Sequence, residues 1–182
     1  MKFSHLHTHS HYSLLDGLGK IDDLVKRAGE LGMDSLALTD HGAMYGAIDF
    51  YKTAKKAGIK PIIGCELYVS RESRLLKRAG IDDKRYHLTV LAKDIDGYKN
   101  LIKLVTKAYL EGFYYKPRVD KELLREHAKG LIVLSGCFQS EISKAVRNKK
   151  GDDAEKLIYE YQEIFGKENF YLEIMPHGTE DE

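Results

Sequence analysis

Apolar residues along the chain recur with two different spacings, and these spacings predict alternating helices and strands. Between residues 21 and 31 they return every three or four positions, which predicts a helix that Gly32 ends. Residues 35–39 then form a short apolar run, which predicts a buried strand. The same pattern predicts strands over residues 2–9, 35–39, 61–69, 86–92, 131–134 and 170–175. It predicts helices over residues 21–31, 46–57, 96–111, 121–128 and 152–165, with another after Cys137.

This alternation of strands and helices is typical of α/β proteins. Strands that are joined by helices favour a mainly parallel sheet or a β/α barrel. In such folds, ligands and chemistry collect at the carboxyl ends of the strands. Residues 70–85 interrupt the alternation with a charged stretch, which we interpret as an exposed loop. A contact with nucleic acid or with a partner protein is the alternative interpretation.

Side chains that can bind metals lie near the ends of these predicted strands. His7 and His9 end the first strand, and they share one face of it because side chains alternate with period two. His41 follows the second strand, and Cys137 follows the fifth. His87 is the exception, because it comes near the start of its strand. Either that boundary is misplaced or the strand runs in an unusual sense.

Most of these residues have a structural alternative when each is taken alone. A single histidine such as His41 or His87 is more often a hydrogen-bonded structural residue than a metal ligand. Asp16, just before a glycine, is more often a turn residue. Cys137 alone is more often a small buried apolar residue. These alternatives lose weight only if the side chains come together in the fold.

Glu66 is harder to explain without a ligand. It follows the apolar residues at 62–65, and a carboxylate in such surroundings needs a cation or a hydrogen-bond donor. Together with the histidines at the strand ends, it favours a metal site. We expect no part in that site for the other histidines of interest, which are His5, His11 and His127.

Composition narrows the class of protein. The length of 182 residues suits one domain, and the apolar fraction of 43% is that of a soluble globular protein. Lysine and arginine total 29 against 28 acidic residues, so net charge gives no argument for nucleic acid binding. Without an apolar run of membrane length or a signal peptide, we expect no membrane partner. The two cysteines do not suggest a disulfide framework, which favours a cytoplasmic protein.

Several motifs occur in the order and spacing of a known family. They are His7-Thr8-His9, Ser13-Leu14-Leu15-Asp16-Gly17, Thr39-Asp40-His41-Gly42, Lys60-Pro61-Ile62-Ile63-Gly64-Cys65-Glu66, Tyr86-His87-Leu88 and Leu134-Ser135-Gly136-Cys137. These motifs resemble the PHP (polymerase and histidinol phosphatase) domain at the N-terminus of the bacterial DNA polymerase III alpha subunit. The segments at 13–17 and 114–120 are specific to the polymerase branch, whereas stand-alone PHP phosphatases share mainly the His-x-His pair.

The resemblance implies a fold and a set of ligands. The fold is a distorted seven-stranded β/α (PHP, TIM-like) barrel, truncated here to about six βα units. Up to three divalent metal ions are implied, with zinc, manganese or iron favoured over magnesium by the mixture of donors. The implied metal ligands are His7, His9, Asp16, His41, Glu66, His87 and Cys137. Asp40 would orient a ligand, and Lys116 or Arg118 could hold a phosphate, although a surface or structural role suits these two cations equally.

The resemblance also implies that the chain, residues 1–182, is an incomplete PHP domain. The family completes its site with a later aspartate and histidine, and the polymerase palm, fingers and thumb would follow, so we expect no polymerase activity here. The implied function is phosphoester hydrolysis, as a 3′–5′ proofreading exonuclease or a pyrophosphatase, within a DNA-directed DNA polymerase. DNA, the remaining polymerase domains and other replisome subunits are the implied partners. The alternatives are a stand-alone phosphatase of the histidinol-phosphatase type and a structural metal-binding scaffold without catalysis.

Overall fold

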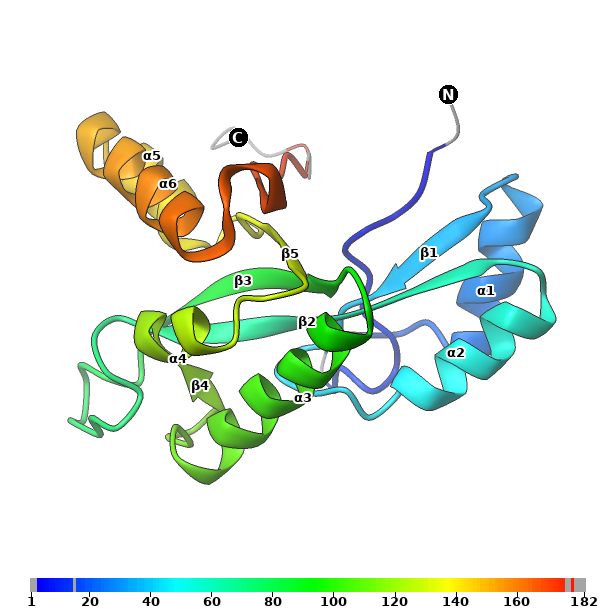
Figure 1. Cartoon of the computed structure of the whole chain (residues 1–182), viewed down its shortest axis with the longest axis horizontal. Helices are drawn as coiled ribbons and strands as arrows, with labels where there is room; N and C mark the ends of the chain where they lie inside the picture. Colours follow the sequence, from blue (N-terminus) through cyan, green and yellow to red (C-terminus); the bar gives the residue numbers. More distant parts are fainter. Residues whose placement is uncertain (1–2, 15, 176–177, 179–182) are drawn as a thin grey trace.

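A six-stranded sheet forms the centre of the molecule in a computed structural model that describes residues 3–14, 16–175 and 178 (Figure 1). Five strands pair in the order β1-β2-β3-β5-β6, and β4 pairs separately with β2. The strands are β1 (Ser35–Leu38), β2 (Lys60–Ser70), β3 (Arg85–Ala92), β4 (Arg118–Val119), β5 (Leu131–Leu134) and β6 (Phe170–Tyr171). The helices are α1 (Ile21–Glu30), α2 (Ala47–Lys56), α3 (Ile95–Leu110), α4 (Lys121–Glu126), α5 (Glu141–Arg147), α6 (Gly151–Phe165) and the 3-10 helix η1 (Lys167–Asn169). Within the described residues the sheet does not close, because β1 and β6 do not pair.

Strand β3 runs against its neighbours. The pairings β1–β2, β2–β4 and β5–β6 are parallel, whereas β3 is antiparallel to both β2 and β5. The start of β3 therefore lies beside the end of β2, and His87 sits opposite Tyr68. This direction explains why His87 comes early in its strand and still lies at the edge where the other candidate ligands gather.

The first predicted strand, over residues 2–9, is wrong. Residue 2 lies outside the described residues, and residues 3–9 run beside β1 without forming a regular strand. Ala37 donates its N–H to the carbonyl of His5, and Thr39 donates its N–H to the carbonyl of Thr8. Between these two bonds the chain advances two residues, from Ala37 to Thr39, on one side but three residues, from His5 to Thr8, on the other. This is the mismatch of a bulge, and it prevents a continuous ladder. The last predicted strand is also shorter than expected, since only Phe170–Tyr171 pair with β5.

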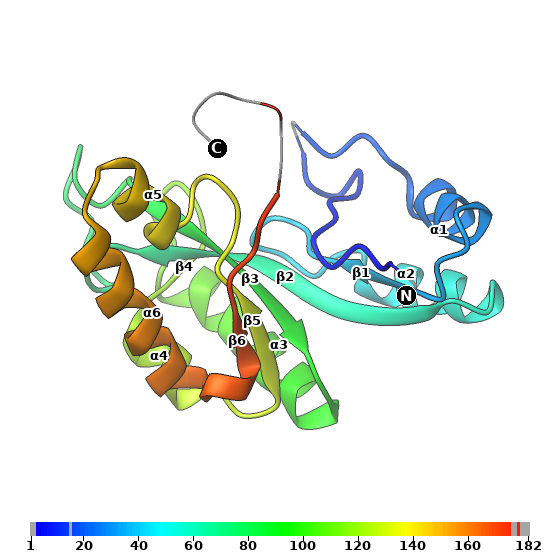
Figure 2. The same ribbon diagram turned by 90° about the horizontal axis from the view of Figure 1, so that it is seen from above.

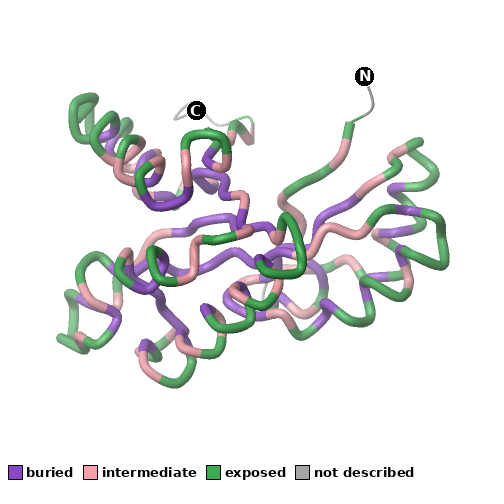
Figure 3. The backbone as a smooth tube through the Cα atoms, in the orientation of Figure 1, coloured by how far each residue is buried: buried purple, intermediate pink, exposed green. Residues whose placement is uncertain are grey.

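The helices form where apolar spacing and capping residues agree. Asp94, Asp120 and Ser140 each accept a hydrogen bond from a backbone N–H in the first turn of α3, α4 and α5. The apolar faces of α3, α4 and α6 pack with the inner strands into the larger core. A second core joins α1, α2 and β1 around Phe50. Figure 3 shows buried stretches on each of these three elements. No helix among the described residues is long and apolar enough to cross a membrane.

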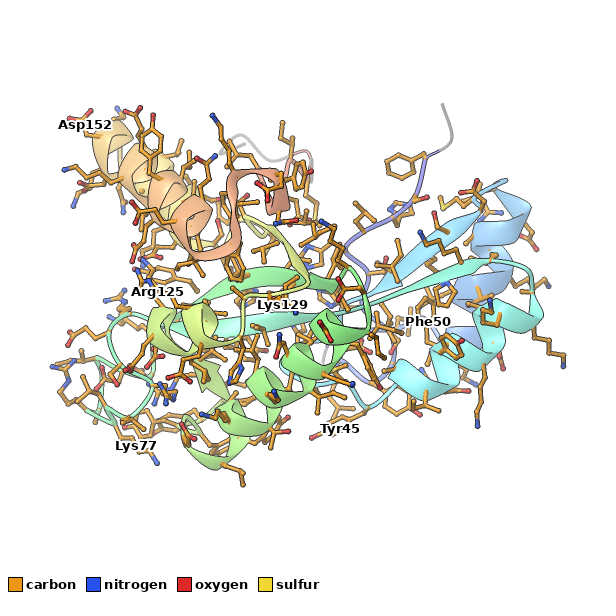
Figure 4. The ribbon with its side chains drawn as sticks, in the orientation of Figure 1. Tyr45, Phe50, Lys77, Arg125, Lys129 and Asp152 are labelled. Carbon is orange, nitrogen blue, oxygen red and sulfur yellow. The ribbon has the colours of Figure 1, made fainter. Side chains whose placement is uncertain are left out.

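Two segments far apart in sequence approach each other over the sheet. Figure 2 shows the segment before α1 and the segment after β6 on the same side of β2 and β3. The loop at 71–84, which connects β2 to β3, extends away from this side, and Lys77 lies near its end (Figure 4). The fold therefore brings the two ends of the described chain to one face, where the candidate ligands lie.

Candidate metal centre

Glu66 lies at the centre of a cluster of candidate metal ligands, in which its carboxylate is surrounded by four histidines, namely His7, His9, His41 and His87. It belongs to β2 and is fully buried, and its two carboxylate oxygens face different histidines. Oε2 lies 2.5 Å from Nε2 of His7 and 3.4 Å from Nε2 of His9. Oε1 lies 3.0 Å from Nδ1 of His41 and in close contact with Nδ1 of His87. One carboxylate therefore joins two separate pairs of imidazoles.

Backbone contacts explain how these side chains reach Glu66. The residue pairs directly with the segment after β1, because its N–H donates to the carbonyl of Asp40 and its carbonyl accepts from Gly42. His41, between those two residues, is placed against the carboxylate. His87 lies on the antiparallel strand β3. It pairs with Tyr68, two residues along β2 from Glu66. The fold thus delivers each imidazole from a different element.

The donor atoms fit divalent cations. His7, His9 and Glu66 form one group whose donor atoms lie within 4.8 Å of one another, and His41, Glu66 and His87 form a second. Nδ1 of His9, Nδ1 of His41 and Oε1 of Glu66 are buried without a well-aligned hydrogen-bond partner in the described chain. Buried polar atoms without partners are costly, and a bound cation would satisfy them. Imidazole and carboxylate donors together suit zinc, manganese and iron.

The charges in the cluster are strongly coupled. Burial alone would raise the pKa of the Glu66 carboxyl, but hydrogen bonds from His41, His7, His87 and His9 outweigh it and lower that pKa far below its usual range. Burial likewise opposes a proton on His7, yet hydrogen bonds to Glu173 and Glu66 raise its pKa to about 9. The neighbouring carboxylates also raise the pKa of His41 against the effect of burial, so protons on His7 and His41 can balance the buried carboxylate.

Asp40 joins the two segments that carry His9 and His41. Its buried carboxylate accepts hydrogen bonds from the backbone N–H of Ser10 at 2.7 Å and from the hydroxyls of Ser10 and Ser13 at 2.9 and 2.7 Å. The Ser13 hydroxyl in turn accepts the N–H of His41 at 3.0 Å. Asp40 therefore acts on His9 and His41 through the backbone around them, and among the described residues its carboxylate has no hydrogen bond to an imidazole.

Two further predicted ligands, Asp16 and Cys137, lie next to histidines that contact Glu66. Asp16, largely exposed, accepts a hydrogen bond from Nε2 of His41 at 2.7 Å. The Sγ atom of Cys137 lies 3.8 Å from Nδ1 of His87, and burial raises the pKa of this thiol. The structure thus brings four predicted ligands, all histidines, together around Glu66. Asp16 lies at the ring nitrogen of His41 that faces away from Glu66, whereas Cys137 lies near the same ring nitrogen of His87 that contacts Glu66. His5 and His11 are exposed, as expected for residues outside the site.

The sequence analysis missed Glu173. Its Oε1 accepts a hydrogen bond from Nδ1 of His7 at 2.7 Å, and both side chains are almost fully buried. The available signal was a lone glutamate between Leu172 and Ile174 in an apolar segment. The same rule that singled out Glu66 applies to it.

The two candidate phosphate contacts have different surroundings. Lys116 lines a cleft of about 640 Å³ above the cluster, and its Nζ lies 5.8 Å from the centre of the Tyr68 ring. Arg85 lines the same cleft, 5.1 Å from that ring. Arg118 is instead fully buried and donates to four backbone carbonyls, which favours its structural role over the phosphate contact.

Aromatic side chains complete the cleft. Tyr12, Tyr45, Tyr68 and Tyr109 line it, and the hydroxyl of Tyr45 donates to that of Tyr109 in α3 at 3.1 Å. Figure 4 shows Tyr45 beside α3. The cleft therefore combines aromatic surface and two cations with the buried carboxylate at its base.

Comparison with known proteins adds four findings. A protein-family description named PHP domain matches residues 5–177. DNA polymerase III subunit alpha of Helicobacter pylori (strain ATCC 700392 / 26695) is 51% identical over 190 residues, which cover 99% of this chain and 15% of that protein. The same subunit of Thermus aquaticus is 50% identical over 186 residues, covering 100% of this chain and 15% of that protein. A solved amidohydrolase from Chromobacterium violaceum aligns with 26% identity and a TM-score of 0.43, over 58% of this chain and 32% of its own.

Proposed function

The chain belongs to the PHP domain family, and from this premise we propose that residues 1–182 act as the PHP domain of a replicative DNA polymerase III alpha subunit and carry a phosphoester-hydrolysing metal centre. Relatives about half identical to the chain support the polymerase branch. The chain spans about 15% of the length of these relatives. Polymerisation, contacts with DNA and contacts with other replisome subunits are therefore proposals about a whole protein, for which we also propose a cytoplasmic location.

One observation carries the proposed chemistry, namely the carboxylate of Glu66 shared between two pairs of imidazoles. His7, His9 and Glu66 would hold one divalent ion, and His41, Glu66 and His87 would hold a second. Asp16 and Cys137 lie next to these histidines and are the proposed additional ligands. Two ions held by a common carboxylate are the usual arrangement for hydrolysis of phosphoesters.

Residues that line the cleft can bind and orient the substrate. Divalent ions at such a site activate water and neutralise charge on phosphate oxygens. Lys116 and Arg85 border the same cleft and can hold phosphate oxygens of the substrate by charge-assisted hydrogen bonds. The tyrosines that line the cleft offer ring faces to a base. This combination supports a nucleotide substrate, and we propose a 3′–5′ exonuclease ahead of a pyrophosphatase.

Hydrolysis by the chain loaded with Mn²⁺ or Zn²⁺ tests this function. The substrates are bis(p-nitrophenyl) phosphate and a 5′-labelled single-stranded oligonucleotide. His9→Ala should reduce both rates at least about tenfold, because it removes a donor beside Glu66. His5→Ala is the matched control, since His5 is exposed and lies outside the cluster.

The outcomes separate three functions. Loss of both activities in His9→Ala, with His5→Ala close to the parent, supports the proposal. Hydrolysis of small phosphate monoesters alone would favour a stand-alone type of phosphatase. Bound metal without any hydrolysis would favour the structural scaffold, and equal rates in the parent and His9→Ala would contradict a catalytic role for this centre.

A further inference from the structure

The first and last described segments of the chain meet in a hydrogen bond at the metal centre. Nδ1 of His7 lies 2.7 Å from Oε1 of Glu173, and the two residues are 166 positions apart in sequence. The side chains are only 5% and 9% exposed, so water competes little for this contact. The carboxylate of Glu173 is not among the donor groups around Glu66 in the described part of the chain.

We propose that Glu173 is a positioning residue, which fixes His7 with its proton on Nδ1 and its Nε2 facing the ion shared with Glu66. The inference rests on the proposed function, because it assigns Glu173 a role toward the ion held by His7, His9 and Glu66.

The two ring nitrogens of His7 face different carboxylates. Nδ1 contacts Glu173 at 2.7 Å, whereas Nε2 lies 2.5 Å from Oε2 of Glu66. When Nδ1 donates its proton to a carboxylate, the neutral imidazole keeps a lone pair on Nε2, and only that atom can bind a metal. A histidine without such a partner samples both tautomers and other ring orientations. Glu173 therefore selects the form of His7 that a metal needs.

Glu173 is itself held in place by two strands. Its backbone N–H donates to the hydroxyl of Ser135, directly after β5, at 2.9 Å. Its Oε2 accepts from the hydroxyl of Thr89, a fully buried residue of β3, at 3.2 Å. Because both oxygens and the backbone have partners, the carboxylate has little freedom to turn toward the ion and become a ligand. This arrangement is that of a group which orients a ligand.

The same contact joins the two ends of the described chain. His7 lies on the segment before α1 and Glu173 on the segment after β6, and Figure 2 shows these segments on one side of the sheet. A bound ion that fixes His7 should therefore also hold the segment around Glu173. Slower amide exchange at residues 172–175 on metal binding is the expected consequence.

Metal affinity and the tautomer of His7 test the role of Glu173. The variants are Glu173→Ala and the conservative Glu173→Gln, with Glu168→Gln as the control that removes a nearby exposed carboxylate. Zn²⁺ affinity is measured by competition with a chromophoric chelator, and the ring nitrogens of His7 are followed by ¹⁵N NMR above pH 9, where the imidazole is neutral and has a tautomer. We expect Glu173→Ala to weaken binding about 10- to 100-fold and to populate both tautomers. Glu173→Gln should lose less, because its amide oxygen still accepts the Nδ1 proton, and Glu168→Gln should match the parent.

Each outcome has one meaning. If the parent binds Zn²⁺ while Glu173→Ala binds it within twofold and keeps a single tautomer, the inference is overturned and the proposed metal centre stands. If the parent binds no divalent ion, the proposed function fails and the inference fails with it. A misfolded alanine variant leaves the decision to Glu173→Gln, for which weaker binding and altered ¹⁵N shifts support the inference and parent-like values overturn it.

Discussion

Arg118 and Lys116 are two residues apart, and the structure gives them opposite roles. The guanidinium of Arg118 is fully buried and donates to the carbonyls of Gly112, Asp82, Arg74 and Leu76 at 2.7–2.9 Å. Three of these carbonyls, those of Asp82, Arg74 and Leu76, belong to the loop at 71–84 between β2 and β3. Arg118→Leu should therefore destabilise the fold, whereas Lys116→Leu should leave stability unchanged and weaken substrate binding.

The size of the effect follows from the carbonyls that lose their donor. A buried acceptor without a partner costs about 1–3 kcal/mol. If local relaxation lets water reach two of the four carbonyls, the other two cost about 2–6 kcal/mol in the free energy of unfolding. This is a large part of the total stability of a domain, which is about 5–15 kcal/mol.

Urea unfolding followed by circular dichroism measures this loss. Lys116→Leu is the control, because Lys116 is only half-buried and borders the cleft, and its free energy of unfolding should stay within about 0.5 kcal/mol of the parent. The same Lys116 variant should raise the KM for the oligonucleotide about tenfold, through loss of one charged hydrogen bond. If Arg118→Leu folds too poorly to measure, Arg118→Lys provides a milder change.

The reverse pattern would refute this reasoning. An Arg118→Leu protein of parental stability with a raised KM would mean that the guanidinium reaches substrate and that its carbonyl contacts contribute little.

Three further predictions concern the cluster and its supporting loop. Burial opposes the proton on His7, but Glu173 and Glu66 outweigh this effect and raise the pKa of His7 to about 9. Because a bound ion must displace that proton, Zn²⁺ affinity should increase from pH 7 to pH 9. Calorimetry in two buffers should detect the proton that is released on binding. Asp40→Asn replaces an acceptor of three hydrogen bonds with an amide, and should cost about 1–3 kcal/mol in urea unfolding while weakening Zn²⁺ binding. Gly17→Ala would place a Cβ 1.8 Å from the carbonyl oxygen of Ser10, and should lower the melting temperature through a loss of about 1–3 kcal/mol.

The helices could be predicted closely from the sequence because their signals are local. Apolar spacing and capping residues such as Asp94 and Asp120 lie within each helix or next to it. The direction of β3 could not be predicted, because it depends on how the loop at 71–84 returns the chain and not on residues in the strand. The bulge beside β1 has no local signal either, since it is a mismatch between two segments 30 residues apart.

The candidate site shows the same division. Residue type and position near strand ends singled out the histidines and Glu66 as candidates, and the family resemblance implied them as ligands. The structure brings these side chains together. Arg118 was left with two alternatives, a phosphate contact and a structural role, because its neighbours in sequence carry no sign that four carbonyls surround it. Glu173 was overlooked because a single carboxylate identifies its partner only when the fold brings His7 to it.

The two groups of donors that share Glu66 are the central claim, and anomalous diffraction from crystals of the chain grown with Mn²⁺ or Zn²⁺ tests it most directly. The account predicts one peak about 2.0–2.2 Å from Oε2 of Glu66, beside His7 and His9, and another at a similar distance from Oε1, beside His41 and His87. Both peaks should disappear in Glu66→Gln, whereas His5→Ala should keep them. Peaks bound elsewhere on the chain, or a parent crystal with none near Glu66, would contradict the account.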